Sequence, residues 1–233
     1  VAAHTDSPNL RIRPRPDRHA VGWRQLGVEV YGGALLNSWL DRDLGLSGRV
    51  VLDDGSGVPE LRELRWDRPL LRVPQLAIHL DRDVSMAGLQ LDKQAHLTPV
   101  WGLGTSTEGD FRVWLADELA VPPAAVLAWD LMCHDLTAPA RLGRGDELFA
   151  ASRLDNLCSS WAGTVALADQ LGAASAQAKG AVPVLVLADH EEVGSTSGVG
   201  AASTLVGRVL AASVRGADGD AASLDAALAG TLV

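Results

Sequence analysis

One apolar run constrains the fold of this chain more than any other stretch. Residues 182–188 read VPVLVLA, without any polar residue. A strand that is buried on both faces of a parallel sheet has this composition. The apolar residues upstream recur at helical spacing: Leu157, Trp161, Val165, Ala168 and Leu171. Residues 199–212 predict another helix, and this alternation of helix and strand favours an α/β fold.

The middle of the chain has a different pattern. Leu26–Tyr31 alternates like a strand, and residues 48–52 and 60–66 flank DDGSG, a good hairpin turn. Residues 74–80, PQLAIHL, predict a further apolar strand. We expect loops over residues 85–110. One helix is expected within residues 111–128, ending before Pro122. Two more strands are predicted over Val126–Leu131 and residues 147–151. The middle of the chain is therefore expected to be rich in β-structure.

These patterns predict two domains. The β-rich block spans residues 15–148 and interrupts an α/β domain built from residues 1–14 and 149–233. Neither α/β piece is long enough to be a domain alone. We expect the two pieces to fold together.

Charge and composition exclude several classes of protein. The formal net charge is -9, and the basic clusters at Arg11–Arg18 and Arg62–Arg72 are interrupted, so no basic face for nucleic acid is expected. No stretch has the roughly 18 apolar residues of a membrane span. Two cysteines, Cys133 and Cys158, give no disulfide framework and predict small buried residues. We expect a cytoplasmic protein.

Polar residues follow the apolar run at once. Glu191 and Glu192 are adjacent, and a glycine-rich turn follows them. Two neighbouring carboxylates at the end of a buried strand repel unless a cation lies between them or one is protonated. A metal site is one interpretation, with one carboxylate as a ligand and the other as a general base. A solvated acidic loop is the alternative.

Two further clusters have both a chemical and a structural interpretation. His4 and Asp6 lie two residues apart, so on an extended segment they share a face, and Asp6 can accept the second ring N–H of a ligating His4. A loop histidine beside a capping aspartate explains the same pattern. Asp155 opens the helix after SRL, where it can cap the helix or bridge two metals. His79, within LAIHL, is more typical of a core or interface histidine, and His19, His96 and His134 show no grouping.

Six segments in this order, AHTDSP, VEVYGG, WLDRDLGLSGRVVL, PQLAIHLDRDV, SRLDNL and DHEEVGS, resemble the aspartyl aminopeptidases over nearly the whole chain. The resemblance implies a cytosolic metallopeptidase with two zinc ions per site. It also implies an α/β catalytic domain around a central sheet, incomplete in this sequence, with an inserted β-rich dimerisation domain. Dimers of that family assemble into a dodecamer.

The resemblance also implies roles for individual residues. His4 binds one zinc, Glu192 binds the other, and Asp155 bridges the two. Asp6 orients His4, and Glu191 is the general base that removes a proton from the attacking water. His79 reaches the substrate in a neighbouring subunit. Substrates are peptides with an N-terminal Asp or Glu, and manganese or cobalt suits the same ligands as zinc.

Two ligands of that family have no counterpart in these residues: an aspartate and a late histidine, both expected beyond Val233. The chain therefore resembles the central fragment of an aminopeptidase. A neutral N-terminal residue is an alternative specificity. A second alternative is a non-catalytic, truncated homologue that acts as an oligomerisation or binding module through its β-rich block.

Overall fold

The computed structural model describes residues 3–172, 182–216 and 221–229, and these form two compact units. One unit comprises residues 8–152, and the other comprises residues 1–7 and 153–233. No described helix has both the length and the apolar composition that a membrane crossing requires.

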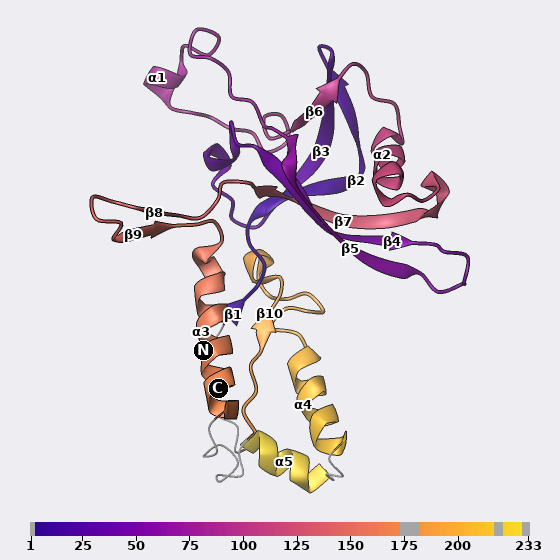
Figure 1. Cartoon of the computed structure of the whole chain (residues 1–233), viewed down its shortest axis with the longest axis vertical. Coiled ribbons are helices and arrows are strands. Elements are labelled where there is room, and N and C mark those ends of the chain that lie inside the picture. Colours follow the sequence, from indigo (N-terminus) through magenta and orange to yellow (C-terminus); the bar gives the residue numbers. More distant parts are fainter. Residues whose placement is uncertain (1–2, 173–181, 217–220, 230–233) are drawn as a thin grey trace. The chain divides into compact units, whose positions relative to one another are not determined.

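The unit of residues 8–152 is built on a six-stranded antiparallel sheet (Figure 1). Its strands lie in the order β5-β4-β7-β2-β3-β6. Their bounds are β2 (Asn9–Ala20), β3 (Trp23–Tyr31), β4 (Leu44–Leu52), β5 (Glu60–Leu71), β6 (Val100–Leu103) and β7 (Val126–Asp135). The shorter elements are η1 (Leu36–Trp39), α1 (Val84–Ala87), η2 (Pro123–Ala125), β8 (Ala140–Leu142) and β9 (Leu148–Ala150).

A helix and aromatic side chains complete the core of this unit. The helix α2 (Asp110–Leu119) contacts β2 and β7 and fully buries Phe111 and Leu115. The ring of Phe111 lies 5.3–5.9 Å from the rings of three tryptophans, which are Trp101, Trp114 and Trp129. These rings belong to the apolar core.

Two strands approach so closely that glycine is required between them. A Cβ on Gly48 would lie 2.0 Å from the carbonyl oxygen of Asp130 on β7, and Gly48 has φ +144°. The β4–β5 hairpin turns where the sequence predicts it, because Asp53 Oδ1 accepts the N–H of Gly55 at 2.8 Å.

The second unit pairs two short strands in parallel. β1 (Ala3–His4) lies beside β10 (Leu187–Ala188), with Ala3 opposite Leu187 and His4 opposite Ala188. The long helix α3 (Leu154–Gly172) contacts β1. The remaining elements are η4 (Glu191–Val193), α4 (Leu205–Gly216) and α5 (Ala221–Ala229).

The prediction of a fully buried strand over residues 182–188 is wrong. Only Leu187 and Ala188 pair with another strand, and Val182 is 85% exposed. Among the described residues β10 pairs only with β1, and most side chains of residues 182–186 are exposed. Leu185, which packs against Gly163 of α3, is partly buried. The apolar stripe of α3 is similarly uncovered among the described residues, with Trp161 69% exposed.

The predicted strand over residues 74–80 is also wrong. The segment forms a turn, and its apolar residues Leu76, Ile78 and Leu80 are all more than half exposed. Residues 85–110, predicted as loop, contain β6 and most of α1, and the helix predicted from residue 199 starts at Leu205.

Of the two cysteines expected to be buried, Cys133 is buried and Cys158 is exposed on α3. The strands predicted around residues 26–31, 48–52 and 60–66 and the helix ending before Pro122 are confirmed.

Candidate metal centre

The pairing of β1 with β10 brings together two segments that are far apart in the sequence. His4 lies opposite Ala188, and the N–H of Thr5 donates to the carbonyl oxygen of Ala188 at 3.0 Å. Glu191 and Glu192 follow three and four residues later, in η4. The carboxyl ends of both parallel strands therefore meet at one edge, where ligands bind in α/β sheets.

His4 is held in one orientation by its neighbours. The residue is 6% exposed, and its Nδ1 donates to the Asp6 carboxylate at 3.1 Å and the Asp6 carbonyl at 3.0 Å. In the neutral imidazole Nε2 therefore carries the lone pair, and it faces the carboxylates of Asp155 and Glu191. Burial lowers the pKa of His4, but the hydrogen bond to the Asp6 backbone and the charges of Asp6 and Glu191 outweigh burial and raise it overall.

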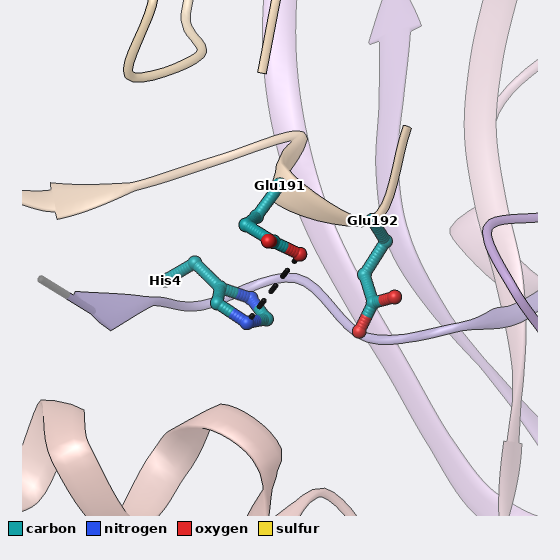
Figure 2. A group of neighbouring side chains, drawn as sticks. All are labelled: His4, Glu191 and Glu192. Atoms are coloured by element: carbon teal, nitrogen blue, oxygen red, sulfur yellow. Dashed lines mark ion pairs between the residues drawn. The ribbon is translucent and has the colours of Figure 1, made fainter. Parts of the chain in front are cut away.

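The two glutamates face this imidazole to different extents. Figure 2 shows the Glu191 carboxylate directed at the His4 ring, and its Oε2 lies 3.7 Å from His4 Nε2. The Glu191 side chain is 54% exposed, whereas Glu192 is more deeply placed. Burial, with repulsion from Glu191, Asp155 and Asp6 added, raises the pKa of Glu192, although His4 partly opposes this.

Asp6 is the most connected side chain of the group. Its carboxylate, 8% exposed, accepts the backbone N–H of Glu191 and of Glu192, each at 3.1 Å, in addition to His4. These contacts link positions 185 and 186 residues apart in the sequence.

Asp155 also lies beside the imidazole. Its Oδ1 is 3.3 Å from His4 Nε2, and its side chain is 83% exposed. The backbone at Asp155 is not helical, so this residue stands at the very start of α3. The structure therefore places four of the predicted side chains around His4.

The group offers suitable donors for a divalent transition metal. His4, Glu191 and Glu192 each provide one ligand atom, and these atoms lie within 4.8 Å of one another. Neutral imidazole and carboxylate are ordinary ligands of zinc. Four carboxylates around one histidine also repel one another, and a cation would relieve that repulsion. The donor set thus fits a zinc ion.

Two polar contacts behind the site have no signal in the sequence. Ser160 on α3 is buried and donates its hydroxyl to the His4 carbonyl oxygen at 2.9 Å, which ties the helix to β1. His190 has a left-handed backbone (φ +58°), and its Nδ1 lies 2.6 Å from Ser197 Oγ. Serine is common in helices and loops, so neither contact could be selected from composition or spacing.

His79 belongs to the other unit. It lies in the exposed turn that replaces the predicted strand, with Ile78 56% exposed beside it. The predicted role of His79 stays a prediction.

The sequence matches known proteins over nearly its whole length. Residues 1–229 match the family described as aminopeptidase I zinc metalloprotease (M18). The chain is 56% identical over 233 residues to a probable M18 family aminopeptidase 2 of Streptomyces coelicolor, covering 100% of this chain and 52% of that protein. The Mycobacterium tuberculosis protein of the same description is 50% identical over 224 residues, covering 94% of this chain and 50% of that protein.

Solved structures show the same fold. A chain in the cryo-EM structure of the Ape4 and Nbr1 complex superposes with a TM-score of 0.82 at 33% identity, covering 90% of this chain and 43% of that one. The predicted fold class, an α/β domain with a β-rich insertion, is thereby confirmed. The chain spans about half the length of the curated relatives it matches.

Proposed function

The chain belongs to the M18 family of aminopeptidase I zinc metalloproteases, and we propose that the intact protein hydrolyses the N-terminal peptide bond of peptides. One observation carries this proposal: His4, Asp6, Glu191 and Glu192 gather at one edge although 185 residues separate the two segments. A solvated acidic loop would not need a buried histidine or a carboxylate bridging both segments.

The proposed roles are those that the resemblance implies, and burial and orientation support the roles of His4 and Asp6. His4 would hold one zinc through Nε2, because Asp6 occupies Nδ1. Glu192, which is less exposed than Glu191, and Asp155 would supply further carboxylate ligands for zinc, including a second ion. When bound, zinc polarises the scissile carbonyl and lowers the pKa of a coordinated water.

Glu191 is the proposed general base. Its carboxylate is exposed enough to meet substrate and water, and it points toward the imidazole that defines the metal position (Figure 2). It would take a proton from the attacking water and pass it to the departing amine. Asp6 would hold His4 in the tautomer that presents Nε2.

A peptide panel tests the reaction and its specificity. We propose that the S1 preference is for Asp or Glu, with a neutral residue such as Leu as the alternative. The intact protein, supplied with zinc, should release the first residue from Asp-, Glu- and Leu-initiated peptides at different rates and lose activity with a chelator. Manganese and cobalt are to be compared with zinc. No release from any peptide under these conditions would contradict the proposal.

Self-association is a second proposed property. We propose that the block of residues 15–148 is a dimerisation domain, and that dimers assemble into a dodecamer in the cytoplasm. The exposed turn around His79 supports this, because Leu76, Ile78 and Leu80 form an uncovered apolar segment. Sedimentation of the intact protein separates these states; a monomer at micromolar concentration would contradict self-association. An oligomer without zinc or hydrolysis would favour a non-catalytic binding module.

A further inference from the structure

Asp6 makes contacts in two directions, and orienting His4 explains only one of them. Toward its own strand, Oδ1 lies 3.1 Å from His4 Nδ1. Toward the opposite segment, Oδ1 accepts the N–H of Glu191 and Oδ2 accepts the N–H of Glu192, both at 3.1 Å. The Asp6 side chain is almost buried, so water competes little for these donors.

The sheet alone does not determine where the two glutamates point. The β1–β10 pairing ends at Ala188, and the chain then passes through His190 in a left-handed conformation before η4 begins. Gly194 and Ser195, just after η4, also have positive φ. The direct hydrogen bonds from the Glu191 and Glu192 amides to Asp6 fix this turn against β1.

Resting on the proposed function, we infer that Asp6 is a positioning residue for both metal positions at once. Through His4 it sets the ligand of one ion, and through the η4 backbone it sets Glu192, the ligand of the other. One carboxylate thereby couples ligands from two distant segments. A residue that only orients His4 would affect a single ion.

Asp6→Asn separates these two roles. Asparagine keeps the size of the side chain and one acceptor oxygen, which can still meet His4 Nδ1. Its amide nitrogen is a donor, so one of the two η4 amides would face a donor instead of an acceptor. Partners that orient metal ligands change metal affinity by about 10–100-fold, so we expect a loss of that size at the ion of Glu192 and a smaller change at the ion of His4.

The test is a cobalt(II) titration of the metal-free intact protein, followed by visible absorption, with zinc competition giving the affinities. His4→Ala and Glu192→Ala identify the two binding phases, because each removes a ligand of one ion only. Asp6→Asn should weaken chiefly the phase that Glu192→Ala removes. Thr5→Val is the matched control, since Thr5 Oγ1 bonds to Ala188 O at 3.4 Å between the same strands without touching a ligand, and it should leave both phases intact.

The outcomes separate this inference from the proposed function. If Asp6→Asn weakens only the phase that His4→Ala removes, the inference is wrong and the proposed function stands. If the wild type shows no cobalt phase, or neither ligand variant changes one, the proposed function fails and the inference fails with it.

A second measurement does not depend on the variant folding. In metal-free wild type, the Glu191 and Glu192 amides should exchange with deuterium slowly, because Asp6 accepts both. Exchange of both at the rate of an unstructured peptide would overturn the inference.

Discussion

Replacing Ser160 by alanine should loosen the strand that carries His4. The Ser160 hydroxyl donates to the His4 carbonyl oxygen at 2.9 Å, and both residues are buried. A protein hydrogen bond contributes about 0.5–1.5 kcal/mol, and leaving a buried acceptor without its donor costs about 1–3 kcal/mol. We therefore expect opening of β1 to become easier by about 1–3 kcal/mol, or about 5- to 150-fold.

Hydrogen exchange at Thr5 measures this opening. The Thr5 amide donates to Ala188 across the β1–β10 pair, so it exchanges only when β1 separates. Thr164→Ala is the matched control, because the Thr164 hydroxyl bonds to the Ser160 carbonyl within α3 at 2.7 Å and does not reach β1. Unchanged exchange at Thr5 in Ser160→Ala, or equal acceleration in both variants, would show that the Ser160 hydroxyl does not hold β1 in place.

Three further predictions concern the unit of residues 8–152. Phe111→Ala should lower the free energy of unfolding by about 3–5 kcal/mol, because the buried Phe111 ring packs among tryptophans. Denaturant unfolding followed by tryptophan fluorescence measures this loss. A loss below about 1 kcal/mol would contradict the packing. The Asp67 carboxylate accepts hydrogen bonds from Arg65 and from the buried His134. Both bonds hold the pKa of Asp67 below the ordinary value of 3.8, and the bond from Arg65 has the larger effect. The ionised Asp67 therefore stabilises the fold above pH 3.8, and this contribution is lost as the pH falls below that value. Asp67→Asn should lower the free energy of unfolding at pH 7 and have the same free energy of unfolding as wild type in acid. An equal difference at both pH values would argue against these contacts. Burial raises the pKa of the Cys133 thiol to about 12, so a thiol reagent at pH 8 should leave Cys133 unmodified until the protein unfolds, and rapid labelling in the native state would disprove that burial.

Local sequence patterns predict much of the antiparallel sheet correctly. Residues 26–31 of β3 alternate, and DDGSG separates β4 from β5, so these strands and the hairpin can be predicted from neighbouring residues alone. Residues 74–80 are also apolar but form a turn. A strand needs a neighbouring strand to pair with, and the local sequence does not show whether such a neighbour exists. Residues 182–188 show the same limitation of local patterns. Their composition is typical of a buried strand, but among the described residues only the short strand β1 pairs with them.

The candidate site was predictable as a set of residues but not as a geometry. Adjacent Glu191 and Glu192 after an apolar run, and the spacing of His4 and Asp6, indicated where chemistry was expected. The contact of Asp6 with two backbone amides depends on the register of β1 against β10, which no local pattern encodes. The hydrogen bond of Ser160 to His4 could not be predicted either, because it joins residues that are distant in the sequence.

Glu191→Gln in the intact protein, measured for both metal content and peptide hydrolysis, tests whether Glu191 is the general base of a metal-dependent aminopeptidase. Glutamine keeps the size of the side chain and removes the base, so we expect both zinc ions to remain bound while turnover falls by about 10²–10⁴-fold, the usual contribution of a general base. The fold should be unchanged, because the Glu191 amide and not its carboxylate bonds to Asp6. Turnover near that of the wild type, with both ions in place, would contradict the assignment of Glu191 as the base.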